Sequence, residues 1–294
     1  MPHNPLTDST SDPSDECLVV SAQGGDRAAL ERLVARHGPW IFNVAARMVW
    51  RREDAADVTQ EVLVKVITRL STFRGESAFR TWLYRIVVNH VIHLKKKQPL
   101  EAAAVPFEYF SRDLDEAGDA PTPDEAGGVP ATLLVEEAKI GCTLAMLMCL
   151  DRRQRVVFVL GEILGVTDQV GAEVMELSPE NFRQILSRAR RDLYSFMADK
   201  CGLVNQANPC RCARKTRGFI DKGYVDPHSL QFVTGRLVEI RSVTPTRVRE
   251  LDALEREHAE LFRGHPLLPA PEEALSVRRL FDQPAVRAVL GADF

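Results

Sequence analysis

Two adjoining stretches between residues 54 and 97 carry side chains suited to holding other macromolecules. The first begins DAADVTQEVLVK, where Asp57, Glu61 and Lys65 recur along one side of a helix. The second, FRTWLYRIVVNHVIHLKKK, mixes cations, aromatic rings and an amide. Cations follow phosphates, rings stack on unpaired bases and an amide reads a base edge. The first stretch therefore predicts an acidic face for a basic protein surface, and the second predicts a helix that binds single-stranded DNA.

Each signal also has a plainer interpretation. Acids spaced before a lysine stabilise a solvated helix by themselves through ion pairs. Phe79 and Trp82, each taken alone, are typical of core packing, and His90 falls on the apolar face, where a core histidine is expected. The two interpretations differ in whether the polar faces of these helices meet a partner or only water.

The helices that must position these side chains follow from apolar periodicity. Val58, Val62 and Val66 repeat at helical spacing in the first stretch. In the second stretch the apolar face begins at Phe79 and continues to Leu94. The remaining face of the second helix would then present its cations, amide and tyrosine outward.

A second group of residues indicates a helix-turn-helix. Thr167 can cap its first helix, residues 175–177 can form the turn, and Ser178-Pro179-Glu180 is a strong helix start. A recognition helix presents such a start to the major groove, where arginine, asparagine and glutamine contact base edges. The residues expected to face DNA are Ser178, Glu180, Asn181, Arg183, Gln184, Ser187, Arg188 and Arg191.

Cysteines supply a third kind of chemistry. Cys201, Cys210 and Cys212 lie among arginines and lysines, and thiolates bind zinc in tetrahedral sites. The spacing lacks the common C-x2-C knuckle, and a fourth ligand would have to come from His228, Cys142 or Cys149. Zinc is therefore one interpretation of these cysteines, and reduced thiols without a cofactor are the other.

Composition places these groups in a soluble, all-α chain. The sequence has 294 residues and a formal net charge of -3. Its start lacks the features of a signal peptide, and no apolar run is long enough to cross a membrane, so we expect a cytoplasmic protein without membrane insertion. No nucleophile–base set or phosphate-cradling loop is present, so no enzyme is predicted. The predicted parts are a disordered tail (1–16), a helical module (17–99), a flexible acidic linker (100–131), a helix-turn-helix module (132–200) and a mostly helical extension (201–294).

The two modules together resemble a known family. The motif DAADVTQEVLVK, followed closely by FRGESAFRTWLYRIVVN, resembles region 2 of bacterial extracytoplasmic-function (ECF) sigma factors of RNA polymerase. That resemblance implies that Asp54, Asp57, Gln60 and Glu61 bind the clamp helices of core RNA polymerase. It also implies that promoter melting and minus-ten recognition involve Phe73, Arg74, Arg80, Trp82, Tyr84, Arg85, Asn89, Lys95 and Lys96.

Residues 132–200 are similar to region 4 of the same family, which reads the minus-thirty-five element of promoter DNA. Gln169 and Gly171 depart from the usual pattern of its first helix. The extension resembles the cysteine-bearing one found in a subset of the family, and we expect it to pack back on the modules and regulate them. The implied partners are core RNA polymerase, promoter DNA and an anti-sigma factor, with no cofactor required. A stand-alone helix-turn-helix regulator and a zinc- or thiol-sensing protein are the alternatives.

Overall fold

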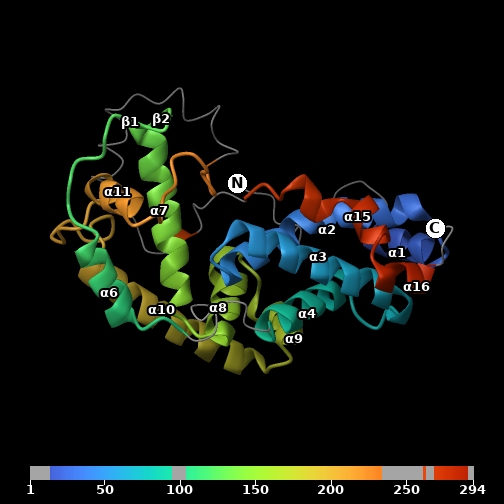
Figure 1. Cartoon of the computed structure of the whole chain (residues 1–294). Coiled ribbons are helices and arrows are strands. Elements are labelled where there is room, and N and C mark those ends of the chain that lie inside the picture. Colours follow the sequence, from blue (N-terminus) through green and yellow to red (C-terminus); the bar gives the residue numbers. More distant parts are fainter. Residues whose placement is uncertain (1–13, 95–103, 234–260, 263–267, 291–294) are drawn as a thin grey trace. The chain divides into compact units, whose positions relative to one another are not determined.

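The computed structural model describes residues 14–94, 104–233, 261–262 and 268–290 (Figure 1). Within these ranges nearly all regular structure is helical. The exception there is a two-stranded antiparallel sheet of β1 (Glu125–Ala126) and β2 (Val129–Pro130). Gly127 and Gly128 join the strands with φ angles of 59° and 79°, which favour glycine. The predicted all-α fold is confirmed.

The described contacts divide the chain into two compact units. One comprises Met1–Lys97, Arg152–Leu186 and Leu267–Phe294, and the other comprises Gln98–Asp151 and Ser187–Pro266. The units do not coincide with the predicted modules, because part of the 132–200 module belongs to each of them. Chain segments far apart in sequence therefore build each unit.

The first unit begins with α1 (Asp15–Gln23), α2 (Arg27–Met48), α3 (Arg52–Arg69), the 3-10 turn η1 (Leu70–Thr72) and α4 (Phe79–Ile92). Ser14 and Asp26 cap α1 and α2 by accepting hydrogen bonds from backbone N–H groups of the first turns. The predicted tail ends earlier than residue 16, because Asp15 and Glu16 form the first turn of α1 and Asp15 is buried.

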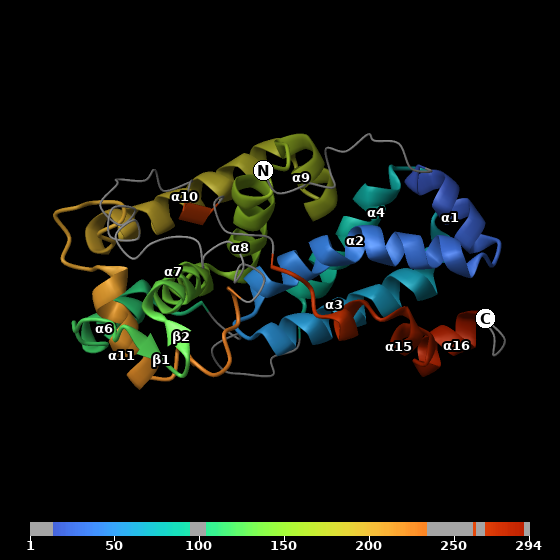
Figure 2. The ribbon, with the colours of Figure 1, turned by 90° about the horizontal axis from the view of Figure 1, so that it is seen from above.

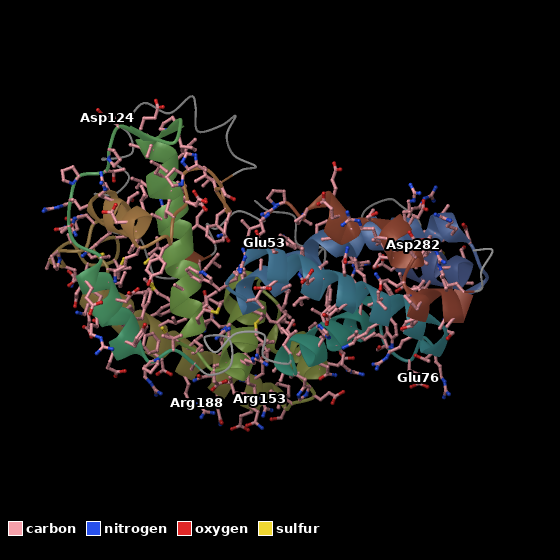
Figure 3. All side chains as sticks on the ribbon, viewed as in Figure 1. Glu53, Glu76, Asp124, Arg153, Arg188 and Asp282 are labelled. Carbon is pink, nitrogen blue, oxygen red and sulfur yellow. The ribbon has the colours of Figure 1, made fainter. Side chains whose placement is uncertain are left out.

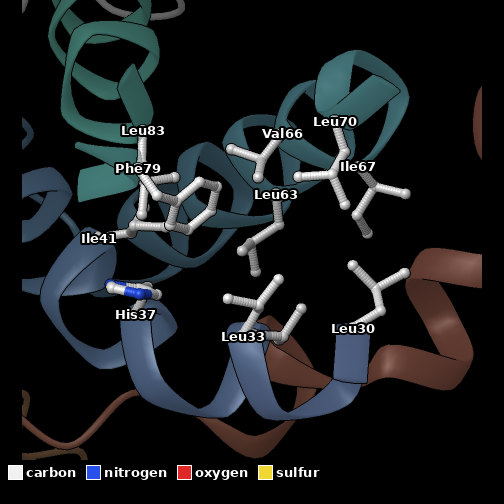
Figure 4. A pocket seen from close by; sticks show the side chains of 11 residues that line it. Leu30, Leu33, His37, Ile41, Leu63, Val66, Ile67, Leu70, Phe79 and Leu83 are labelled. Atoms are coloured by element: carbon white, nitrogen blue, oxygen red, sulfur yellow. The ribbon is translucent and has the colours of Figure 1, made fainter. Parts of the chain in front are cut away.

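α2, α3 and α4 pack around an apolar interior. Figure 4 shows a small cavity in it, which is lined by aliphatic side chains, the ring of Phe79 and His37. Ile41, Leu63 and Leu83 line it and are at most 2% exposed. Burying each such side chain stabilises the fold by about 1.5–3 kcal/mol. This packing fixes which faces of α3 and α4 point outward.

Further segments complete the first unit. They are α8 (Arg152–Phe158), the π-helical turn η2 (Val159–Ile163), α9 (Asp168–Met175), the first turns of α10 (Pro179–Lys200), the 3-10 turn η4 (Glu272–Leu275), α15 (Val277–Phe281) and α16 (Pro284–Leu290). The glycine at position 171, which departs from the usual pattern of this helix in the family, has a packing reason. A Cβ at Gly171 would lie 2.5 Å from the ring of Phe182 in α10. The glycine lets the two helices of the turn approach closely.

The second unit contains α6 (Phe107–Glu116), the β1–β2 hairpin, α7 (Ala131–Met148), the rest of α10 and α11 (Cys212–Asp221). The prediction of a flexible linker is wrong for residues 107–116, which form α6. Phe110 and Leu114 are buried one helical turn apart, and the Phe107 and Phe110 rings lie 5.1 and 5.7 Å from that of Phe196. Acidic composition concealed this apolar spacing.

Two remaining expectations concern the extension and the membrane. The described parts of the predicted extension include α11, η4, α15 and α16, whereas its residues 234–260, 263–267 and 291–294 lie outside the described residues. Among the helices of the described ranges, none is long and apolar enough to cross a membrane.

Candidate protein and nucleic-acid interfaces

α3 presents its predicted protein-binding residues at different exposures. Its first turn contains Glu53 (labelled in Figure 3) and Asp54, which favour the positive end of the helix dipole. Val58, Val62 and Val66 are buried as predicted. The opposite side therefore faces outward, with Asp57 and Glu61 exposed and Asp54 and Gln60 half-buried.

Two half-buried residues of α3, Gln60 and Arg52, contact the C-terminal segment that begins at Leu268. The Gln60 side-chain amide donates to the carbonyl oxygen of Glu273 at 2.6 Å. Arg52 donates to the carbonyl oxygen of Pro269 and lies over the Phe42 ring, 5.3 Å from its centroid. One part of the predicted protein-binding face is thus occupied within the chain, while the acids Asp57 and Glu61 remain exposed.

α3 and α4 share a histidine contact. Lys65 Nζ lies 2.5 Å from His90 Nδ1, and His90 Nε2 lies 3.3 Å from a carboxylate oxygen of Glu61. Burial, together with the charge of Lys65, lowers the pKa of His90 to about 4. The imidazole is therefore neutral at pH 7 and can accept a hydrogen bond from Lys65. The expectation of a core histidine fits its 8% exposure.

Aromatic rings gather where the loop after η1 meets α4. The centroid of the Phe73 ring lies 5.6 Å from that of Phe79 and 5.5 Å from that of Trp82. Phe79 is buried beneath this cluster, while Phe73 and Trp82 are half-buried. Arg74 and Asn89 are exposed. The predicted base-stacking rings, a cation and an amide are therefore accessible on this side, whereas Lys95 and Lys96 lie outside the described residues.

Tyr84, predicted to face DNA, is in the core instead. It is 1% exposed, and its ring centroid lies 3.7 Å from that of Trp40 in α2. Burial raises the pKa of its hydroxyl well above the usual range. The periodic apolar stripe of α4 identified one buried face, but α4 is packed on a second side that the stripe does not include.

Arg80, also predicted to face DNA, belongs to a buried ion cluster. Its Nε lies 2.9 Å from Asp15 Oδ2, and Arg36 Nη1 lies 2.8 Å from Asp15 Oδ1. His37 Nε2 is 3.1 Å from the same Oδ1. Burial alone would raise the pKa of Asp15, but His37 and the two guanidinium groups outweigh it and hold the pKa well below its usual range. Arg80 therefore ties α4 to α1 and α2.

Arg85, the next predicted DNA contact, points toward the helix-turn-helix segment. Its guanidinium lies 3.9 Å from the Glu173 carboxylate and 3.6 Å from that of Glu176, and it donates to the carbonyl oxygen of Glu173 at 3.4 Å. α9 packs against α4 around this contact. Glu176 ends α9 with a φ of 54°, the left-handed region that favours glycine.

α10 has the start and the faces that the sequence predicts. Ser178 Oγ accepts from the backbone N–H of Asn181 at 3.2 Å, and Thr167 caps α9 in the same way at 3.4 Å. Phe182 and Leu193 are buried on the inner face. Arg183 pairs with Asp168 of α9. The predicted DNA-facing residues are all exposed: Ser178, Glu180, Asn181, Arg183, Gln184, Ser187, Arg188 (labelled in Figure 3) and Arg191.

Five cysteines of the second unit interact electrostatically: Cys142, Cys149, Cys201, Cys210 and Cys212. Cys201 directly follows α10 and is paired with Cys210 through a parallel β-bridge. Cys212 is the first residue of α11. Burial, then the charges of Cys210, Cys212 and Cys201, raise the pKa of the Cys142 thiol in α7. No disulfide joins the six cysteines, and in the part of the chain that the structure describes no three His, Cys, Asp or Glu side chains are arranged to hold a metal ion. Zinc at Cys201, Cys210 and Cys212 stays a prediction.

Known proteins are similar to this chain in the first predicted module and over a longer stretch that includes further residues. Residues 33–99 match the model of the Sigma-70 region 2 family. The RNA polymerase sigma-H factor of Pseudomonas aeruginosa is 32% identical over 182 residues, which cover 60% of this chain and 90% of that protein. The ECF RNA polymerase sigma-E factor of Escherichia coli K12 is 29% identical over 177 residues, covering 60% and 91%.

A solved structure is also similar. The structure of CnrH in complex with the cytosolic domain of CnrY aligns with a TM-score of 0.45 and 25% identity, covering 62% of this chain and 96% of that one. The two relatives above align over most of their own length, whereas a large part of this chain has no counterpart in them.

Proposed function

Because the chain belongs to the extracytoplasmic-function sigma factors of RNA polymerase, we propose that α3 and α4 divide two tasks in transcription initiation. The protein recognises promoter DNA for RNA polymerase. On this proposal α3 binds core polymerase through Asp54, Asp57, Gln60 and Glu61. α4 and the loop before it bind the melted minus-ten element, and α10 binds the minus-thirty-five element.

One observation carries this division: an exposed acidic row and an accessible ring cluster lie on neighbouring helices. Asp57 and Glu61 are exposed on α3, and Phe73 and Trp82 are half-buried near the start of α4. Carboxylates suit a basic protein surface, and rings suit unpaired bases. Stacking contributes about 1–3 kcal/mol per base, so two accessible rings would matter.

Burial and pairing within the chain reduce the set of residues that we propose for the minus-ten contact. Tyr84 is buried and Arg80 is paired with Asp15, so on this proposal both hold α4 in position and do not contact DNA. The DNA contacts then fall to Phe73, Arg74, Trp82, Arg85 and Asn89, of which Arg85 is paired with Glu173 and Glu176. Lys95 and Lys96 keep their predicted role. A separate anti-sigma factor stays a predicted partner.

The α10 surface supports the second DNA contact. Its cap, its buried stripe and its exposed row of arginines, amides and hydroxyls have the arrangement of a recognition helix. Nothing in this arrangement favours a stand-alone regulator, which would leave the acidic row of α3 without a role.

Charge reversal on α3 tests the proposal. Asp57→Lys with Glu61→Lys should reduce the affinity for core RNA polymerase by about a hundredfold, because two carboxylates would become repulsive cations. The measurements are binding to purified core polymerase and run-off transcription from genomic promoter fragments. Asp199→Lys with Asp221→Lys makes the same charge change at exposed acids of the second unit and should leave binding unchanged. Equal binding by both double variants would contradict the role of α3.

A further inference from the structure

The C-terminal segment 268–290 docks along α2 and α3 of the first unit. Asn43 anchors its start: the side-chain amide donates to the carbonyl oxygen of Leu268 at 2.9 Å, and its Oδ1 accepts from the backbone N–H of Leu268 at 2.8 Å. Asn43 is 1% exposed and Leu268 is 4% exposed. A buried amide that satisfies both backbone groups of one residue makes a specific contact, since leaving those groups unpaired would be costly.

The next turn, η4, meets both helices. Gln60 of α3 donates to the carbonyl oxygen of Glu273 at 2.6 Å, and Arg52 donates to that of Pro269. On α2, Gly38 makes room for Leu275: a Cβ at Gly38 would lie 2.4 Å from Leu275 Cδ2. The absence of a side chain at Gly38 thus leaves the space that the Leu275 side chain occupies.

The last helices, α15 and α16, are held by apolar side chains. Leu280 and Val286 are each 1% exposed, and both helices pack against α3. Arg27 of α2 lies over the Phe281 ring, 4.5 Å from its centroid. Figures 1 and 2 agree in placing α15 and α16 beside α2 and α3. In contrast, Val289 on α16 is 50% exposed.

From these contacts we infer that segment 268–290 and core RNA polymerase compete for α3. The inference rests on the proposed role of α3. Gln60, one of the proposed polymerase contacts, already donates its amide to Glu273. Asp57 and Glu61 remain exposed on the same helix. A polymerase surface that takes up Gln60 together with these acids must first displace η4.

Competition has a measurable consequence. If the docked form dominates, the apparent dissociation constant for polymerase exceeds the intrinsic one by the inverse of the undocked fraction. An undocked fraction near one tenth would weaken binding about tenfold. The segment is part of the same chain, so this reduction does not depend on protein concentration.

The test displaces the segment in the full-length chain. Leu280→Asp with Val286→Asp puts two charges into the buried face of α15 and α16, and binding to purified core polymerase should tighten about tenfold. Val289→Asp, an exposed position on the same helix, should bind as the wild type does. Circular dichroism checks that the helices persist. Phe281→Ala, which removes only the ring beneath Arg27, provides a milder variant and should tighten binding by a smaller factor.

Each outcome decides a different point. Tighter binding by the double variant and unchanged binding by Val289→Asp support competition. Unchanged or weaker binding by both the double variant and Phe281→Ala, with wild-type binding intact, overturns the inference and leaves the proposed function standing. If the wild type itself fails to bind core polymerase, the proposed function falls first. A peptide of residues 267–291 added to the double variant should restore the weaker binding.

Discussion

α3 and α4 are neighbouring helices with different proposed tasks, and other parts of the chain contact them through different chemistry. On α3, the polar contacts with segment 268–290 are exposed hydrogen bonds from Gln60 and Arg52 to backbone carbonyl oxygens, and the segment buries the apolar side chains of Leu280 and Val286. On α4, Arg85 meets the carboxylates of Glu173 and Glu176 at 3.6–3.9 Å, and both carboxylates are about half exposed or more.

The two kinds of contact should differ in the conditions that break them. Half-exposed ion pairs contribute about 0–1 kcal/mol each and weaken as salt screens them. Buried apolar anchors and hydrogen bonds to backbone carbonyls are much less sensitive to salt and depend on shape. A competing polyanion such as DNA should therefore displace the contacts of Glu173 and Glu176 with α4. Segment 268–290, by contrast, should be displaced from α3 only by a partner whose shape fits α3 better.

The largest expected effect comes from the ion cluster that holds α4 in place. Asp15→Asn removes the charge that Arg36 and Arg80 share and should reduce the free energy of unfolding by about 3 kcal/mol, as for other broken buried pairs. Urea denaturation at pH 7 measures it. Asp26→Asn is the matched control, because Asn caps a helix as well as Asp does and should change little.

The same cluster gives a pH dependence with a definite sign. The pKa of Asp15 lies below its unfolded value, so the folded state binds this proton less readily. Its stabilisation is complete above about pH 4 and is lost as pH falls toward the lower folded pKa. The wild type and Asp15→Asn should therefore converge in stability below pH 4. If Asp15→Asn behaves like Asp26→Asn at pH 7, the cluster does not hold α4.

A smaller effect is expected from the shape of α9. Gly171→Ala would put a Cβ 2.5 Å from the Phe182 ring, and overpacking of this kind costs about 1–3 kcal/mol. The better helix propensity of alanine offsets about 1 kcal/mol, so a net loss of up to about 2 kcal/mol is expected in thermal or urea unfolding. This loss should not vary with salt, unlike the Arg85 contacts.

Gly141→Ala is the matched control for this change. Its Cβ would lie 3.4 Å from the Phe232 ring, close to an ordinary contact, so the same substitution within α7 should be neutral or slightly stabilising. Equal effects at the two glycines would show that Gly171 is not needed for the approach of α9 to α10.

Local pattern predicted a large part of the fold and of α10. The cap at Ser178, the proline start and the buried positions Phe182 and Leu193 all follow from residues within one helix. The buried side of α3 at Val58 and Val62 followed from the same kind of pattern. These features depend on neighbours in sequence, and a single sequence contains that information.

The misplaced residues depend on distant neighbours. Tyr84 is buried by Trp40, and Arg80 is paired with Asp15, 65 positions away. The contact of Asn43 with Leu268 joins positions 225 apart. A periodic stripe shows that a helix has one buried side, but it cannot show that a second side is also covered. The helix α6 was missed because its apolar residues stand among many acids and turn-forming residues.

The smallest effect is at the end of α9, where Glu176 adopts a left-handed backbone with a φ of 54°. This conformation costs a residue other than glycine about 1–2 kcal/mol, so Glu176→Gly should relieve strain. The same change removes the carboxylate 3.6 Å from Arg85, which contributes about 0–1 kcal/mol. The lost pair offsets only part of the relieved strain, so the unfolding free energy should rise by about 1 kcal/mol.

Salt separates these two terms. Between about 0.05 and 1 M NaCl the Debye length falls from over 10 Å to about 3 Å, so the Arg85–Glu176 pair should weaken in the wild type. Glu176→Gly lacks the pair, and its stability should change less over the same range. Glu173→Gln removes the 3.9 Å pair with an unchanged backbone and should flatten the salt dependence without relieving strain. If all three proteins respond to salt alike, charge does not hold α9 on α4, and the contrast with α3 is lost.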